Sequence, residues 1–253
     1  MNLIQLFTIV RRDVKAAFRT PTQFLAAPMI TAFLYIFIFG SVMGSRVGDI
    51  AGVPYIIFVF PGILTLNVIM AAFNGAAMRI YFARFLHFIQ EVLVAPISYS
   101  ELILGSLLSV FVRVISIAAG IALIGVIFGA VSFAHIVFFI AWLFLTTCFF
   151  GLLGFLVGLW ADNFEQLGAF PTFIVTPLAF LGGMFTSIHM LPGWMQIVSH
   201  FNPFFYVING FRYAMTGYSE TSILFGGAVM LVATVALFVL TVHLVSKGWR
   251  IRE

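Results

Sequence analysis

The stretch FAHIVFFIAWLFLTTCFFGLLGFLVGLW (residues 133–160) contains no Asp, Glu, Lys or Arg. Its apolar side chains fall on odd and even positions alike, whereas the strands of a membrane β-barrel alternate apolar and polar residues. In hydrocarbon every backbone N–H and C=O must be paired within the protein, and an α-helix pairs them within one segment. The stretch therefore predicts a membrane-spanning helix.

The rest of the chain has the same character. Of its 253 residues, 63% are hydrophobic and only 8% are charged, and the mean hydropathy is +1.18. Soluble domains carry about 25% charged residues. The composition predicts an all-α integral membrane protein that forms a single transmembrane domain over residues 1–253. The net charge of +4 gives no indication of a nucleic-acid partner. The His residues lack ligand spacing and Cys148 is alone, so no metal site is expected.

A membrane span needs about 20 apolar residues. Six windows meet this requirement: 24–44, 56–78, 102–128, 133–160, 168–186 and 222–245. A further apolar stretch, 187–218, is different because turn-forming and polar residues interrupt it. This pattern indicates short external re-entrant or interfacial helices rather than another span. The interrupting residues are Pro192, Gly193, Asn202, Pro203, Gly210 and Arg212.

The positions of Lys and Arg predict the orientation. Cations gather in the N-terminal segment, in the loop after the second span and in the C-terminal tail. If the chain has six spans, these three regions lie on the same side of the membrane. By the positive-inside rule this side is cytoplasmic, and both termini lie on it. Of the Lys and Arg residues outside the spans, only Arg46 and Arg212 fall on the opposite side.

Two segments outside the spans are amphipathic. Residues 3–19 predict an interfacial helix with its cations near lipid headgroups, or else a plain cytoplasmic start. Residues 79–95 place an apolar stripe opposite the polar residues Arg84, His87 and Glu91. This second segment can offer its polar face to a cytoplasmic partner or serve as a simple connector, and periodicity does not decide between the two.

Arg113 lies inside the third span. A cation at mid-bilayer costs at least about 2.5 kcal/mol. It should therefore face the helix bundle, an aqueous path or a carboxylate such as Glu101, Asp162 or Glu165. A contact on the route of an anionic headgroup, a structural ion pair and a side chain that snorkels to the interface all remain open.

Three segments, in order, resemble type-2 ABC export permeases. They are FIQEVLVAPIS (88–98), PTFIVTPLAFLGGMFTSIHMLP (171–192) and NPFFYVINGFRYAMTG (202–217). That family exports nodulation factors, polysaccharides, teichoic acids and drugs. The resemblance implies a six-span permease subunit of the bacterial cytoplasmic (inner) membrane. It would work as a homodimer in which each copy binds one cytoplasmic ABC ATPase, two ATPase copies in all.

The resemblance also implies roles for segments. Residues 3–19 would be the connecting helix, and 79–95 the coupling helix with Arg84, His87 and Glu91 as ATPase-coupling residues. Residues 187–218 would form the exit segment, with the site residues Pro192, Gly193, Asn202, Pro203 and Arg212. The chain has no G-x-x-x-x-G-K-[ST] phosphate loop. It is therefore expected to be no enzyme and to hold no cofactor, with ATP and Mg bound by the partner ATPase.

The expected function is ATP-driven export of an amphipathic substrate, such as a glycolipid, a lipid-linked saccharide or a drug. An ion-coupled secondary transporter is one alternative, but it needs carboxylates near span centres, where no Asp or Glu lies. A non-transporting membrane scaffold is the other alternative.

Overall fold

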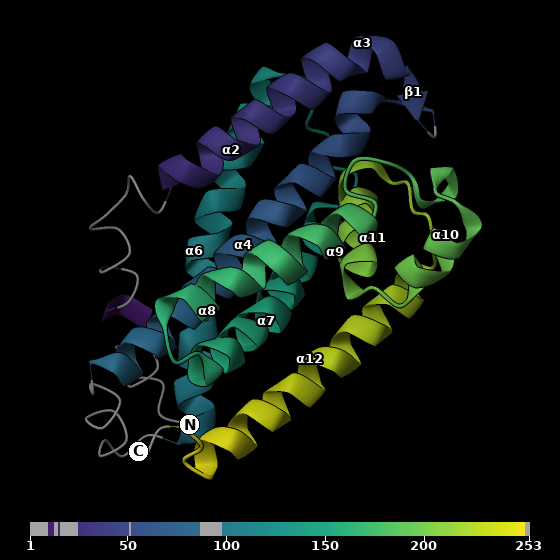
Figure 1. The fold of residues 1–253 in the computed structure, drawn as a ribbon. Coiled ribbons are helices and arrows are strands. Elements are labelled where there is room, and N and C mark those ends of the chain that lie inside the picture. Colours follow the sequence, from purple (N-terminus) through teal and green to yellow (C-terminus); the bar gives the residue numbers. More distant parts are fainter. Residues whose placement is uncertain (1–9, 13–14, 16–24, 51, 87–97, 251–253) are drawn as a thin grey trace.

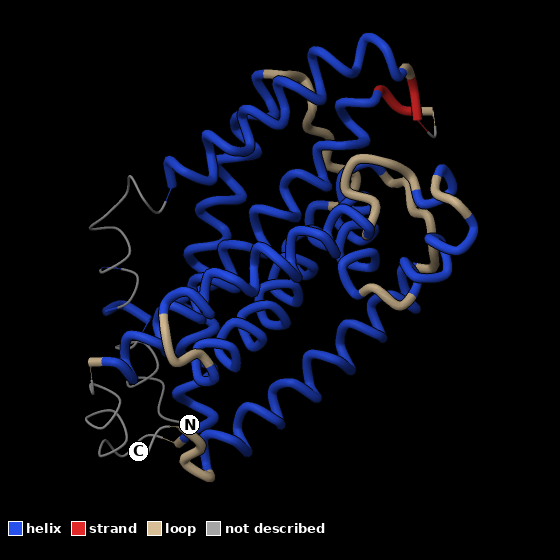
Figure 2. The backbone as a smooth tube through the Cα atoms, viewed as in Figure 1, coloured by secondary structure: helices blue, strands red, loops and turns tan. Residues whose placement is uncertain are grey.

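The computed structural model describes residues 10–12, 15, 25–50, 52–86 and 98–250. Its long helices run roughly alongside one another as a bundle (Figure 1, Figure 2). Five helical segments are long and apolar enough to cross a membrane: Tyr55–Phe85, Tyr99–Ile127, Ile136–Trp160, Phe164–Leu181 and Ile223–Ser246. The chain is thus an all-helical membrane protein, and the described residues add to the helices only one pair of two-residue strands.

The first apolar segment is also helical. It runs without a break through α2 (Ala27–Tyr35), the π-helical η2 (Ile36–Met43) and α3 (Gly44–Val47). The strands β1 (Asp49–Ile50) and β2 (Val53–Pro54) then reverse the chain as an antiparallel pair. Gly52 sits in the turn between them at φ +79°, a conformation that glycine adopts without a Cβ penalty.

Helix α4 (Tyr55–Phe85) forms the centre of the bundle. Within its most apolar window 83% of the residues are buried, against 11% for α12 (Ile223–Ser246). Helix α7 (Ile136–Trp160) packs directly on α4. A Cβ on Gly154 or Gly158 would collide with the backbone carbonyl of Phe73 or Ala77. Small residues one turn apart thus let these two helices approach closely.

Helix α4 also differs from its predicted boundary. The span was expected to end at residue 78, before a separate helix at 79–95, yet α4 continues to Phe85. Neither proline nor glycine interrupts residues 79–86, and the guanidinium of Arg84 binds the neighbouring helix α7. Residues 87–97, which include His87 and Glu91, lie outside the described residues, as does most of the 3–19 segment.

Two of the long helical segments, Tyr99–Ile127 and Phe164–Leu181, begin with side-chain caps. Ser98 caps α6 (Tyr99–Ile127) with a capping box. The Ser98 hydroxyl accepts a hydrogen bond from the Glu101 backbone N–H, and the Ser98 backbone N–H donates to the Glu101 carboxylate. Asn163 caps α8 (Phe164–Phe170) by accepting the Gln166 N–H at 2.8 Å. Helix α8 continues through the π-helical η3 (Pro171–Val175) into α9 (Thr176–Leu181). The π turns begin at Pro171, which has no N–H to donate.

The stretch expected at 187–218 is broken into short helices. These are η4 (Ile188–Met190), α10 (Gly193–His200) and α11 (Pro203–Thr216). Helix α11 ends at Gly217, which adopts the left-handed conformation at φ +77°. The predicted breaks at Pro192–Gly193 and Asn202–Pro203 are the starts of α10 and α11.

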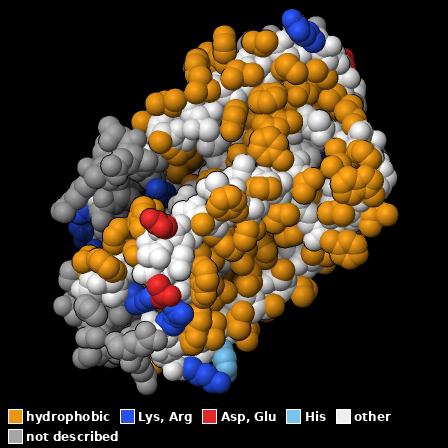
Figure 3. All heavy atoms as spheres, in the orientation of Figure 1, with side chains coloured by type: hydrophobic (Ala, Val, Ile, Leu, Met, Phe, Trp, Pro, Cys, Tyr) orange, Lys and Arg blue, Asp and Glu red, His pale blue; other side chains and the backbone are white. Residues whose placement is uncertain are grey.

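The two ends of the bundle differ in charge. Figure 3 shows Lys, Arg, Asp and Glu side chains gathered toward one end of the molecule, while hydrophobic side chains cover most of the remaining visible face. Helices α4 and α7 end there, α6 begins there, and the chain after α12 returns to them. The opposite end holds α3, the strand pair and α10 (Figure 1).

Candidate functional site

A cavity of about 360 Å³, called the central cavity below, lies between helices about halfway along α4 and α6. Four separate helices supply its wall, namely α2, α4, α6 and α9. Polar groups from all four reach it: Thr31 and Tyr35, Asn67 and Asn74, Arg113, and Thr176. A space of this size with this many polar partners can hold several water molecules or a polar headgroup.

Arg113 is the charged residue on the described wall of this cavity. Its stem passes α4 closely, since a Cβ on Gly75 would lie 3.7 Å from the Arg113 Cδ. Glu101 lies about 18 Å earlier along the same helix, too far for a direct ion pair. Asp162 contacts Arg84 and Arg250 instead, at the charged end of the bundle. The structure therefore places Arg113 on the cavity wall, and whether it acts in transport or in a structural contact stays a prediction from the sequence.

Two asparagines of α4 share the cavity with Arg113. Asn67 donates to the Ile63 carbonyl at 2.9 Å, which holds its amide against its own helix. Asn67 and Asn74 are seven residues apart, a spacing that places two side chains on one helix face. Sequence analysis did not identify them, although this spacing within an apolar span was the available signal.

Arg84, one of the predicted coupling residues, is held by its own chain. Its guanidinium donates to the carbonyl oxygens of Gly158 and Leu159 and lies 3.6 Å from the Asp162 carboxylate. These carbonyls belong to the last turn of α7, where a helix leaves acceptors unpaired and carries a partial negative charge. Arg84 thus fastens the end of α4 to the end of α7.

Arg250 reaches the same place from beyond α12. It donates to the Trp160 carbonyl at 3.0 Å and forms an ion pair with Asp162. Asp162 therefore connects two arginines that come from opposite parts of the sequence. The cluster joins the ends of three spanning helices at the charged end of the bundle.

The predicted exit residues have clear local roles. Pro192 and Gly193 start α10, and Pro203 is the first residue of α11. Asn202 accepts the Phe204 N–H at 3.0 Å and donates to the Leu178 carbonyl of α9 at 2.7 Å. It thus caps α11 and ties that helix to α9 at the same time.

Arg212 also belongs to α11, and it is completely buried. It pairs with Glu220 at 3.0 Å, donates to the Gly183 carbonyl at 2.7 Å and lies over the ring of Phe58 at 3.9 Å. Glu220 also accepts the Ile188 N–H at 3.0 Å. Sequence analysis treated Arg212 as an external charge and did not identify Glu220 at all. The pair locks α11, the start of α4 and the 182–188 turn together.

Comparison with known proteins gives consistent matches. Residues 4–216 match the family model of the ABC-2 type transporters. The chain is 34% identical to the inner membrane transport permease YadH of Escherichia coli (strain K12), over 99% of this chain and 98% of the relative. It is 26% identical to nodulation protein J of Rhizobium meliloti (strain 1021), over 76% of this chain and 72% of the relative. The putative transport permease ycf38 of Cyanophora paradoxa is 26% identical over 89% and 78%. The family match includes the residues that line the central cavity and helices α10 and α11.

Proposed function

The chain belongs to the ABC-2 type transporter family as a membrane permease that lacks an ATPase domain, and from this premise we propose that it exports an amphipathic substrate. The family implies a separate partner ATPase, which would bind ATP and Mg. Two copies of the permease would form a homodimer and bind two ATPase copies. The substrate class would be a glycolipid, a lipid-linked saccharide or a drug.

The central cavity is the observation that carries this proposal. Its polar groups, Arg113 and the two asparagines among them, lie in the middle of helices that are otherwise strongly apolar. Polar and ionisable groups at this depth are costly and usually mark a transport pathway. An amphipathic substrate could place its polar head against these groups and its apolar part toward lipid.

The helices around the cavity have a feature suited to motion. The first and fifth spans each contain a π-helical segment, η2 and η3, and both of these spans contribute to the cavity wall. π-Helical segments occur frequently at functional sites, and their wider turns make the pattern of backbone hydrogen bonds less regular. We propose that these two spans shift to open the cavity.

The energy for this shift would enter at the charged end. Nucleotide bound to the partner ATPase would favour one of two permease conformations, as any ligand-driven change requires different affinities for the two states. Because α4 continues to Phe85, the part of the 79–95 segment that follows this helix, with His87 and Glu91, is the proposed contact with the ATPase. The role of Arg84 in this contact would be indirect, because its described partners lie at the end of α7.

The topology proposed here has six spans with both termini in the cytoplasm. The unbroken helix Ala27–Val47 would be the first span, in addition to the five long ones. The charged end would then face the cytoplasm, as the positive-inside rule requires. Helices α10 and α11 would form the external re-entrant segment of the exit.

Co-purification tests the partnership. The full chain carrying an affinity tag should retain a phosphate-loop ATPase from its native membranes, and this ATPase should hydrolyse ATP faster with the permease than without it. Glu91→Ala should reduce the stimulation about tenfold, as expected when a charge-assisted contact is lost. Arg46→Ala, at the opposite end of the bundle, is the matched control and should leave it unchanged. Full stimulation by the Glu91→Ala protein would show that the coupling assignment is wrong.

A further inference from the structure

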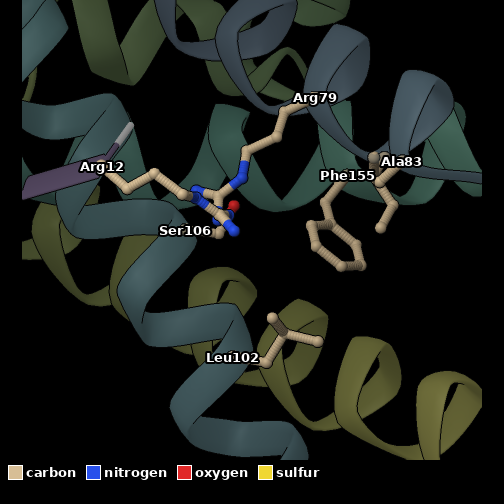
Figure 4. Close-up of a pocket in the computed structure, with 7 residues that line it drawn as sticks. Arg12, Arg79, Ala83, Leu102, Ser106 and Phe155 are labelled. Carbon is tan, nitrogen blue, oxygen red and sulfur yellow. The ribbon is translucent and has the colours of Figure 1, made fainter. Parts of the chain in front are cut away.

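The central cavity has different neighbours in the two directions along the bundle. Toward the charged end, a separate cavity of about 50 Å³ has Arg12, Arg79 and Ser106 on its wall (Figure 4). Toward the opposite end, which holds α3 and the strand pair, four aromatic side chains lie together. This aromatic cluster consists of Tyr35, Phe39, Phe180 and Phe185.

Phe185 is the centre of the aromatic cluster. Its ring stacks on that of Phe39 with the centroids 4.0 Å apart, and it meets the ring of Tyr35 edge-on at 6.0 Å. The ring of Phe180 lies 5.2 Å away. Phe185 is only 9% exposed, so the rings around it exclude water. Because Tyr35 also belongs to the wall of the central cavity, the aromatic cluster begins at the cavity itself.

The aromatic cluster lies on the side of the cavity that faces away from the charged end. Tyr35 is the last residue of α2, and Phe39 lies about one turn further along the same continuous helix, toward α3. Phe185 follows the end of α9, in the 182–188 turn. Both segments run toward the end of the bundle that holds α3 and the strand pair (Figure 1). A molecule that left the cavity in this direction would meet Phe39 and Phe185.

The two sides of the aromatic cluster are held differently. The 182–188 turn is fixed to α4, because the Tyr55 hydroxyl donates to the Phe185 carbonyl at 3.3 Å. It is also fixed to α11, because Arg212 donates to the Gly183 carbonyl at 2.7 Å. Phe39, in contrast, lies in the π-helical η2, where the backbone hydrogen bonds are less regular. The turn thus provides a fixed side, and η2 provides a side that can move.

We propose that Phe39 and Phe185 form an aromatic gate that closes the central cavity toward the end of the bundle with α3 and the strand pair. The inference rests on the proposed function, because a gate has a role only if the cavity is a transport path. The stacked rings close the path in the structure described here. Movement of η2 away from the 182–188 turn would separate the rings and open the cavity at this end.

Cysteine labelling from one side of the membrane tests the gate. The full chain with Cys148→Ser and Asn74→Cys carries its thiol on the cavity wall. A parallel protein with Asp49→Cys, an exposed position in β1, identifies the vesicles in which the strand-pair end faces outward. In these vesicles, without ATP, a membrane-impermeant maleimide should label Asn74→Cys slowly.

Opening the gate should accelerate this labelling. Phe39→Ala and Phe185→Ala should each raise the rate about tenfold, because the lost stacking favours the closed state by an energy that corresponds to a population ratio of about that size. Phe39→Leu and Phe185→Leu should raise it less, since leucine keeps part of the apolar volume. The leucine variants replace the alanine variants if these have lower melting temperatures.

Phe37→Ala is the matched control. It removes the same kind of ring from the same π-helical segment, but Phe37 is 47% exposed and stacks on Phe33 outside the aromatic cluster. This substitution should change the labelling rate less than about twofold, as expected for an exposed position.

The gate and the proposed function fail by different results. Unchanged labelling in the Phe39→Leu and Phe185→Leu proteins, each with an unaltered melting temperature, would overturn the gate. An equal acceleration by Phe37→Ala would also overturn it, because it would indicate a general loosening of η2. If the gate variants accelerate labelling but ATP and the partner ATPase leave the rate for Asn74→Cys unchanged, the gate is supported and the ATP-driven path is contradicted.

Discussion

Arg212 and Glu220 form an ion pair that is fully enclosed by protein: their charged atoms are 3.0 Å apart and each side chain is 1% exposed. Each partner also has a second contact, Arg212 with the Gly183 carbonyl and Glu220 with the Ile188 N–H. Removing one partner of such a pair leaves an uncompensated buried charge, which costs about 3–5 kcal/mol.

We therefore expect Arg212→Met to destabilise the protein by about that amount, measured by thermal unfolding of the purified chain in detergent. Glu220→Gln should also be destabilising. The double variant Arg212→Met with Glu220→Met should recover much of the loss, because no unpaired charge remains. Strictly additive effects of Arg212→Met and Glu220→Met would mean that the two residues do not act as a pair.

The contact between α4 and α7 gives a second prediction. Gly154→Ala should lower the melting temperature, since the new Cβ collides with the Phe73 backbone and overpacking costs about 1–3 kcal/mol. Gly168→Ala is the matched control, because Gly168 is also helical and has nothing within 4 Å of an added Cβ. That control should be neutral or slightly stabilising, since alanine favours a helix. Equal melting temperatures for the two variants would contradict the close packing.

The cluster at the charged end predicts unequal effects of its members. Arg84→Gln should cost about 1–2 kcal/mol, because this partly buried cation caps the last turn of α7. Asp162→Asn should cost less than about 1 kcal/mol, because its side chain is 59% exposed and its ion pairs are screened by solvent. Thermal unfolding at low and high salt measures both losses of stability. Only the loss caused by Asp162→Asn should become clearly smaller at high salt. A larger loss of stability from Asp162→Asn than from Arg84→Gln would contradict the view that Arg84 is the more important member of the cluster.

The long apolar helices were predictable because long apolar runs and helix-ending residues act locally. The predicted window 133–160 ends where α7 ends, at Trp160, and 222–245 lies one residue from α12. The comparisons also confirm the family resemblance read from three segments. The end of α4 was misplaced because Arg79 and Arg84 looked like loop residues. The contacts of Arg84 with the end of α7 hold the continued helix in place instead.

The site was harder to predict because it depends on which helix faces meet. Arg113 could be identified from the sequence because a cation within an apolar span is energetically costly. Asn67 and Asn74, which line the same cavity, lie on another helix, so the sequence did not connect them with Arg113. Glu220 follows α11 in a short connection, where an acidic residue normally lies in water. Only the folded position of Arg212 shows that this carboxylate is buried.

The most direct test of the account is the accessibility of the central cavity in the presence of the partner ATPase. In a Cys148→Ser background, Asn74→Cys places a thiol on the cavity wall, and Leu64→Cys places one at a position with 0% exposure. A water-soluble maleimide should label Asn74→Cys at a rate that changes several-fold when ATP binds to the ATPase. Leu64→Cys should remain unlabelled in both states. Labelling of Asn74→Cys at the same rate with and without ATP would contradict the claim that this cavity is the ATP-driven export path.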